Sequence, residues 1–213
     1  MTWTFGSFEL PPTSIRALLE LGKLGPSDVF VDLGSGTGKV VMRAAQVYKV
    51  RLAIGVELEV RSRERARLDA IKLLNKEQLS RVDFWLGDIH SEDFEYDRVT
   101  VVYNSFEEDE EEVPLYREKF PRRFRLLKKD LPLVGYAPSG AVRRGRTWFF
   151  RMDFPLTRVR SKAKWANLVM GRPNSTVEDV YDHYRNVWKK RGTTAKDARI
   201  GLNKLEGLLL KRF

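Results

Sequence analysis

Cysteine is absent from this chain of 213 residues, and histidine occurs only at His90 and His183. Without cysteine there is no disulfide framework, no thiolate metal site and no cysteine nucleophile. Two histidines far apart in the sequence argue against a structural zinc site, so no metal is expected. No stretch approaches the roughly 18 consecutive apolar residues of a membrane-spanning helix, and no basic-then-apolar leader opens the chain. We therefore expect a soluble, cytoplasmic protein without membrane contact.

Acidic residues are outnumbered, 29 Asp and Glu against 39 Lys and Arg, which gives a net charge of +10. That excess is unusual for an enzyme of a small neutral substrate and indicates an anionic partner, nucleic acid first. Between Arg143 and Arg172 only one acid, Asp153, accompanies nine basic residues, with several aromatic residues among them. This run predicts a face that contacts RNA, most plausibly ribosomal RNA. The cations predicted to form it are Arg143, Arg144, Arg146, Arg158, Arg160, Lys162 and Lys164.

The most informative stretch is residues 28–45, DVFVDLGSGTGKVVMRAA. A short apolar run at 29–31 has the length and composition of a strand. Asp32 and a glycine turn at 34–38 follow, and apolar residues then recur at helical spacing. Strand, glycine turn and helix form the cofactor site of a βαβ unit, because glycines let the backbone approach a ligand and the helix N-terminus offers free N–H groups.

A second acid, Glu57, closes the next apolar run, 19 residues after Gly38. An acid at that place typically binds the hydroxyls of a ribose. The pattern D-x-G-x-G-x-G differs from the dinucleotide loop G-x-G-x-x-G and resembles motif I of class I S-adenosylmethionine (SAM) methyltransferases. The resemblance implies SAM as the cofactor. Its predicted binding residues are Asp32, Gly34, Ser35, Gly36, Gly38, Glu57, Leu58, Asp88, Ile89, Phe8 and Pro12.

Two of these predictions have a structural alternative. In SAM enzymes a lead-in segment often folds over the cofactor, which makes Phe8 and Pro12 candidates for a lid, but Phe8 could equally plug the sheet edge. Asp88 follows the run 82–86, where an acid in this fold usually contacts the adenine amine. It could instead cap the turn that follows.

The resemblance also predicts the fold class, α/β, with a Rossmann-like seven-stranded class I methyltransferase sheet. After the first strand and the helix from Lys39 to Tyr48, strands are expected at 52–56, 82–86, 99–103 and 131–136, and segments 147–154 and 163–170 are expected to pair as an antiparallel closing hairpin. Helices are expected from Thr13 as N-cap to Leu21, over 60–75, and over 115–129 with a kink at Pro121, and a loop at 139–146. Residues 1–172 form the predicted methyltransferase domain, and 173–213 an appended basic helical hairpin whose first helix opens with the capping-box pattern Ser175-Thr176-Val177-Glu178.

The predicted catalytic residues are Tyr103, Asn104, Ser105 and Phe106, at the end of the fourth strand. Ligands in open α/β sheets bind at the carboxyl ends of parallel strands. The Asn104 side chain could accept a hydrogen bond from an amine, and a neighbouring aromatic ring could stack on a planar substrate. Alternatively, Asn104 or Ser105 could be a helix N-cap.

Residues 5–138, about two-thirds of the chain, resemble the non-SET histone lysine methyltransferases and the small archaeal lysine methyltransferases. The matching segments are 30–36, Gly38 with Val40 and Val41, Gly55 to Glu57, and Tyr103 to Phe106, where that family has Asn-Asn-Phe. The last segment is also similar to the Asn-Pro-Pro-Tyr/Phe signature of enzymes that methylate exocyclic base amines. Here both prolines of that signature are missing.

Two functions therefore compete. The charge asymmetry favours an RNA methyltransferase that modifies an exocyclic base amine, most plausibly cytidine N4 of ribosomal RNA. The family resemblance, together with the acidic run 107–112 that could attract a cationic tail, supports a protein lysine methyltransferase as the alternative. A non-catalytic SAM-binding protein would leave the intact cofactor motif unexplained. The sequence leaves the oligomeric state open.

Overall fold

The computed structural model describes residues 9–88 and 98–104 without a break. Further described positions are 96, 120, 123–129, 141–144, 147–154, 163, 166–167, 170, 173–176, 178–180, 182 and 186. Predicted site residues outside this part are Phe8, Ile89, Ser105, Phe106, Arg146, Arg158, Arg160, Lys162 and Lys164. The predicted strand 131–136, the acidic run 107–112 and most of the predicted C-terminal hairpin also lie outside it.

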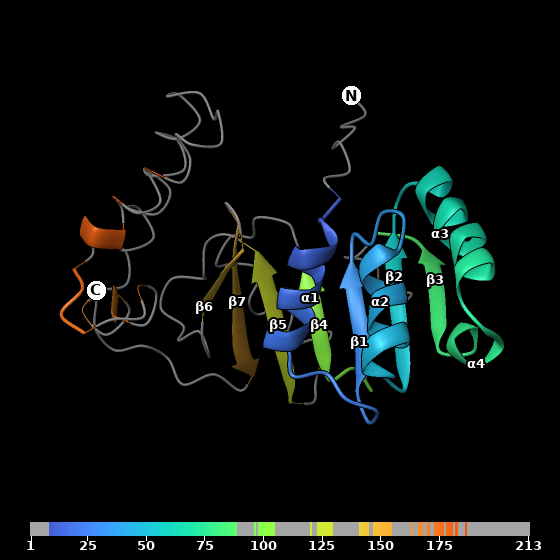
Figure 1. Ribbon diagram of the computed structural model, residues 1–213, viewed down its shortest axis with the longest axis horizontal. Helices are drawn as coiled ribbons and strands as arrows, with labels where there is room; N and C mark the ends of the chain where they lie inside the picture. Colours follow the sequence, from blue (N-terminus) through green and yellow to red (C-terminus); the bar gives the residue numbers. More distant parts are fainter. Residues whose placement is uncertain are drawn as a thin grey trace.

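A mixed sheet forms the centre of the fold, with the strand order β3-β2-β1-β4-β5-β7-β6 (Figure 1). The first five strands in this order, β3, β2, β1, β4 and β5, are parallel to one another. Strand β7 runs antiparallel to both β5 and β6. The strands are β1 (Val29–Leu33), β2 (Leu52–Glu57), β3 (Val82–Leu86), β4 (Val101–Asn104), β5 (Phe124–Lys129), β6 (Ala141–Arg144) and β7 (Thr147–Phe154). The predicted α/β, Rossmann-like fold class is confirmed, and it places any ligand at the carboxyl ends of the parallel strands.

Four helices are described: α1 (Pro12–Leu21), α2 (Lys39–Tyr48), α3 (Val60–Leu73) and α4 (Lys76–Leu79). Helices α1 and α2 cover one face of the sheet, where their apolar residues enter the same core (Figure 1). Helix α3 lies over β2 and β3 and buries Ala66 and Ala70. Within the described residues no helix is long and apolar enough to span a membrane.

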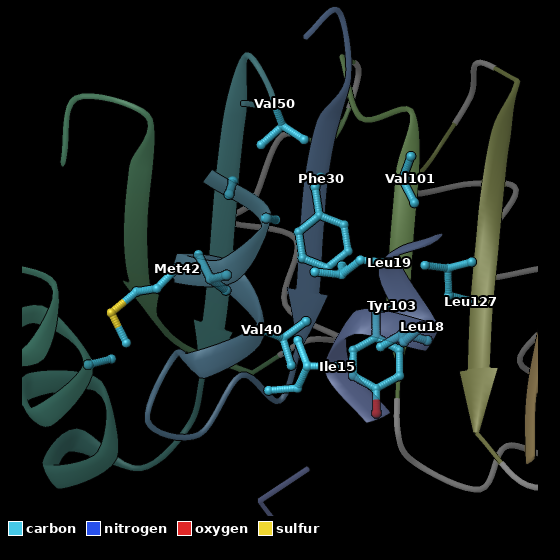
Figure 2. Close-up of a cluster of buried hydrophobic side chains, with 14 of the residues drawn as sticks. Ile15, Leu18, Leu19, Phe30, Val40, Met42, Val50, Val101, Tyr103 and Leu127 are labelled. Carbon is cyan, nitrogen blue, oxygen red and sulfur yellow. The ribbon is translucent and has the colours of Figure 1, made fainter. Parts of the chain in front are cut away.

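Strand β1 is buried along its whole length because its side chains alternate between two apolar cores. Phe30 enters the core beneath α1 and α2, close to Ile15, Leu19 and Val40 (Figure 2). The neighbouring residues Val29, Val31 and Leu33 belong to the core on the other face. A strand buried on both faces needs a continuous apolar run, which explains why VFV could be identified as a strand from sequence.

Helix α1 begins two residues earlier than predicted. Its N-cap is Pro11, Pro12 is its first residue, and the predicted cap Thr13 lies inside the helix. The carbonyl of Pro11 accepts hydrogen bonds from the amides of Ser14 and Ile15, at 2.9 and 3.0 Å. Proline suits the first helical position because its φ is already helical and its missing N–H would have had no partner there.

The prediction of helix across 115–129 is wrong where the structure describes it, because Phe124–Lys129 is strand β5. This strand lies between β4 and β7 and pairs with both. Its basic residues suggested a solvated helix, but Lys128 is only 2% exposed. Strand pairing on both sides has overridden the local preference for helix.

The closing hairpin also differs from the prediction. Its two strands are β6 and β7, so the predicted loop 139–146 contains a strand. Residues 163, 166, 167 and 170 are helical, so the prediction of a strand over 163–170 is wrong. The reason lies in the pairing: β5 and β6 occupy both edges of β7, so 163–170 cannot pair with 147–154 as predicted. Strand β4 covers 101–104 rather than 99–103.

Near residue 175 the predicted capping box is shifted by one position. Thr176 Oγ1 accepts a hydrogen bond from the Asp179 amide at 3.1 Å, and Asp179 Oδ2 accepts one from the Thr176 amide at 2.7 Å. The reciprocal pair is therefore Thr176 with Asp179, and residues 178–180 are helical. The division into domains 1–172 and 173–213 stays a prediction.

Candidate active site

The turn between β1 and α2 is built from three glycines in the left-handed region, Gly34 (φ 77°), Gly36 (φ 53°) and Gly38 (φ 74°). The carbonyl of Val56 in β2 accepts hydrogen bonds from the amides of Gly34 and Ser35, at 2.9 and 3.0 Å. Residues with a Cβ adopt such φ values only with strain, so the alternating glycines are a requirement of this turn.

Two of the glycines have different surroundings. A Cβ on Gly38 would lie 2.4 Å from Cε1 of Phe84, so this glycine permits α2 to pack closely. A Cβ on Gly36 would meet no atom within 4 Å. Gly36 therefore presents bare backbone to open space, as a turn that approaches a ligand must.

Glu57 ends β2 beside this turn. Its Oε2 accepts a hydrogen bond from the Gly36 amide at 2.7 Å, and its Oε1 accepts one from the Glu59 amide at 2.9 Å. Each carboxylate oxygen has two acceptor sites, so each keeps one after these bonds. The two hydrogen bonds thus hold the carboxylate in place, and each oxygen keeps one acceptor site for a ligand. Two such sites side by side suit the two neighbouring hydroxyls of a ribose.

Asp32 lies in β1 and is only 2% exposed. Burial, with a smaller contribution from the nearby Glu57 carboxylate, raises the pKa of its side chain to about 8. A buried acid directly before a glycine turn is costly unless it meets a positive charge. The ammonium group of an amino acid bound at the turn would provide that charge.

The acceptor end of the sheet meets the cofactor turn through strand pairing. Asn104, the last residue of β4, is in register with Leu33 of β1, which directly precedes the glycine turn. Asn104 is 1% exposed and lies beside the equally buried Lys128 of β5. Sequence reasoning missed Lys128, because a lysine in a basic segment gives no signal of burial.

Tyr103 points to the opposite face from Asn104, as neighbouring residues of a strand do. Its ring is buried in the core against α1, near Leu18 and Ile15, and its hydroxyl points toward the carboxyl ends of the strands (Figure 2). The ring is therefore a packing group, and only the hydroxyl is directed toward the acceptor end.

Glu9, three residues before α1, makes a contact that the sequence did not reveal. Glu9 Oε1 accepts a hydrogen bond from Thr37 Oγ1 at 2.7 Å, and Glu9 Oε2 accepts one from Lys39 Nζ. These bonds, that from Lys39 first, lower the pKa of Glu9. Glu9 thus ties the N-terminal segment to the glycine turn. Pro12, a predicted lid residue, is exposed at the start of α1.

The other predicted site residues that the structure describes are Leu58, Asp88, Arg143 and Arg144. Leu58 is 70% exposed directly after Glu57, an apolar surface that a planar base could cover. Asp88 is exposed just after β3, and the neighbouring Gly87 amide donates to the Glu57 carbonyl at 3.0 Å. Of the basic face, the backbones of Arg143 and Arg144 lie in β6, and the Arg144 side chain is exposed.

These residues fit S-adenosylmethionine: an oriented carboxylate for a ribose, an exposed apolar residue for a base, bare glycine backbone and a buried acid for an amino acid. When bound, this cofactor supplies a methyl group on a sulfonium, and SAM is the cofactor of this protein. Among the described residues no group of three or more His, Asp or Glu could hold a metal ion.

Comparison with known proteins finds similarity to methyltransferases. The family model described as "Histone methylation protein DOT1" matches residues 4–108. A protein-lysine N-methyltransferase of Saccharolobus islandicus is 24% identical over 134 residues, which span 62% of this chain and 81% of that protein. The Caenorhabditis elegans histone-lysine N-methyltransferase specific for H3 lysine-79 is 40% identical over 55 residues, 26% of this chain and 6% of that protein.

Among solved structures, an RNA methyltransferase from Salinibacter ruber, crystallised with S-adenosyl-L-homocysteine, superposes with a TM-score of 0.63 at 23% identity. The superposition covers 72% of this chain and 97% of that one, and it shows a shared fold. The strand order of the sheet and the similarity to these methyltransferases agree with the predicted methyltransferase fold. The chain is a class I SAM-dependent methyltransferase that resembles the non-SET lysine methyltransferases.

Proposed function

We propose that this enzyme transfers the methyl group of SAM to the side-chain amine of lysine in a protein. The observation that carries the proposal is the extent of the family match: residues 4–108 include the glycine turn, Glu57, and the end of β4 with Tyr103 and Asn104. The similarity therefore covers the acceptor end of the site as well as the cofactor end. The net charge favours an RNA acceptor, whereas the lysine methyltransferases among the relatives support a lysine acceptor.

The site chemistry suits an amine acceptor. A lysine side chain has a pKa near 10.4 in water and must lose a proton before its lone pair can attack a methyl group. A buried site lowers that pKa because burial disfavours the charged amine. The amide oxygen of Asn104, at the carboxyl end of β4, can accept a hydrogen bond from the neutral amine and orient its lone pair.

The test combines an acceptor assay with one variant at the acceptor end of the site. Purified enzyme is incubated with tritiated SAM and, separately, with unmodified ribosomal RNA, transfer RNA and cell protein. Protease-sensitive label that amino-acid analysis identifies as methyl-lysine is expected. Asn104→Ser should abolish methyl transfer and leave SAM affinity nearly unchanged. The reason is that Asn104 ends β4 and is not one of the predicted cofactor-binding residues. Normal turnover in that variant, with normal SAM binding, would contradict the assignment of Asn104.

A second candidate is favoured by one observation, the net charge of +10 with its basic run after residue 143. In that case the acceptor is an exocyclic base amine, most plausibly cytidine N4 of ribosomal RNA. Asn104 would again accept a hydrogen bond from the amine. The same assay separates the two candidates, because nuclease-sensitive label that nucleoside analysis assigns to methylcytidine would replace the lysine proposal.

A further inference from the structure

A hollow lies on the α1 side of the sheet, between the end of that helix and the β6–β7 hairpin. It encloses about 280 Å³. Its charged lining residues are Glu20, Lys23, Arg144 and Arg151. No residue of the glycine turn, β2 or the end of β4 lines it, so it is separate from the methyl-transfer site.

The lining of this hollow is positively charged. Its one acid, Glu20, already forms an ion pair with Arg16 at 2.7 Å. Arg151 is held in place by Asp153 at 3.1 Å and by the Leu21 carbonyl at 3.3 Å. No acidic side chain in the described part of the chain pairs with Lys23. With Arg16 and Asp153 included, this region carries four positive and two negative charges, and the positive excess favours an anion.

Lys23 is held at the hollow in an unusual backbone conformation. Its φ is 48°, in the left-handed region that glycine or asparagine usually occupies after a helix. Its amide donates to the Glu20 carbonyl at 3.0 Å, and its own carbonyl accepts a hydrogen bond from Arg125 at 2.9 Å. Lys49 at the end of α2 has a similar φ of 51°, so this is how two helices of the chain end. At the hollow, the two hydrogen bonds fix the backbone that carries the Lys23 side chain.

We propose that this hollow binds a phosphate group of a nucleic-acid strand. Guanidinium and ammonium groups together are typical phosphate ligands, since Arg offers paired donors and Lys a compact charge. The volume lies below the usual range of pockets for drug-sized ligands, which suits one phosphate and its sugar. The net charge of +10 favours the polyanion over an acidic peptide. The proposal holds whether the methylated amine belongs to lysine or to a base.

The test measures binding of fluorescein-labelled single-stranded RNA, and of duplex DNA of equal length, by fluorescence anisotropy across a range of salt concentrations. The variant combines Lys23→Asn, which tolerates the left-handed backbone, with Arg144→Gln. The control is Lys72→Gln, which removes one exposed cation from α3 on another part of the surface. SAM affinity is measured for all proteins as a check on folding.

The double variant should lose nucleic-acid affinity several-fold and lower the slope of log Kd against log salt by about one, the loss of one phosphate contact. Lys72→Gln should change neither quantity appreciably. An equal effect of Lys72→Gln, or an unchanged slope in the double variant, would overturn the proposal. Binding of a poly-glutamate peptide that is lost in the double variant, with RNA and DNA binding intact, would identify an acidic protein as the ligand and also overturn it.

Discussion

The Gly36 amide donates a 2.7 Å hydrogen bond to Glu57 Oε2, so the carboxylate that ends β2 is bonded to the centre of the glycine turn. The two features that the sequence predicts for the cofactor site, a turn and an acid 19 residues after it, are therefore one structural unit. Each oxygen of Glu57 accepts a hydrogen bond from a backbone N–H. The NH2 group of a glutamine at this position could not accept such a bond.

Glu57→Gln should weaken SAM binding by roughly tenfold to a hundredfold, because hydrogen bonds to a charged group contribute about 1.5–3 kcal/mol. In addition, the NH2 group of glutamine would place a donor against one of the two backbone N–H donors, and neither could then form a hydrogen bond there. Isothermal titration calorimetry with SAM measures the change. Glu59→Gln is the matched control, since that exposed side chain lies two residues further on and does not contact the turn. Equal affinities of the two variants would contradict the ribose-binding role.

The glycines of the turn should separate packing from ligand approach. Gly38→Ala places a Cβ 2.4 Å from Phe84 and keeps φ at 74°, so it should destabilise the fold by about 2 kcal/mol or more. Gly36→Ala meets no atom within 4 Å and should cost only about 1 kcal/mol of backbone strain. Its Cβ would occupy the space that the cofactor needs.

The measurements are urea unfolding and SAM titration on both variants. Gly36→Ala should lose SAM affinity with little change in the free energy of unfolding, whereas Gly38→Ala should show a large loss of stability. If Gly36→Ala binds SAM normally, the open side of the turn does not face the cofactor.

Much of this site follows from local sequence. Strands β1, β2 and β3 are apolar runs, and the spacing from Gly38 to Glu57 is set by one helix and one strand, so both could be predicted. In contrast, β5 reads FRLLKK, a mixture of apolar and basic residues that is a strand only because β4 and β7 flank it. Residues 163, 166, 167 and 170, which are helical, were predicted as strand for the same reason, since only the completed sheet shows which edges are occupied.

The contacts that complete the site depend on tertiary structure. Asn104 was predicted from its place at a strand end, but its position beside Leu33 follows from β4 pairing with β1, which no local pattern indicates. Glu9 gave no signal at all, because its partners Thr37 and Lys39 lie 28 and 30 residues away. Local chemistry could therefore be predicted, and contacts across the fold could not.

Arg125 provides a stability test away from the cofactor. Its guanidinium donates to the carbonyls of Gly22 and Lys23 at 2.7 and 2.9 Å and pairs with Asp28, so it joins β5 to the end of α1 and the start of β1. Arg125→Met keeps the aliphatic stem and removes the donors. A loss of about 2 kcal/mol in urea unfolding is expected, since a partly buried ion pair and two carbonyls lose their partner.

The control for this variant is Arg16→Met on the exposed face of α1, where both members of the Arg16–Glu20 pair are solvent-accessible. Exposed pairs contribute little, so no measurable loss is expected. A similar loss in both variants would mean that the effect of Arg125→Met is not specific to its buried contacts.

Asp32 should make both stability and SAM binding depend on pH. In the folded protein its pKa is about 8 against an ordinary value of 3.8, so between these values the folded state binds the extra proton. Stability from this group is therefore fully present below pH 3.8 and is lost as the pH rises through 8. Asp32→Asn should flatten that decline and make the protein more stable than wild type at pH 9, by up to several kcal/mol.

Cofactor binding should show the opposite trend, because an ammonium group beside Asp32 favours its ionised form. Wild-type SAM affinity should rise between pH 6 and pH 8, with release of a proton that calorimetry in buffers of different ionisation enthalpy detects. Asp32→Asn should bind SAM weakly, with no proton release in this range. Proton release that persists in Asp32→Asn would assign the titrating group elsewhere, because the amide that replaces the carboxyl does not ionise in this range.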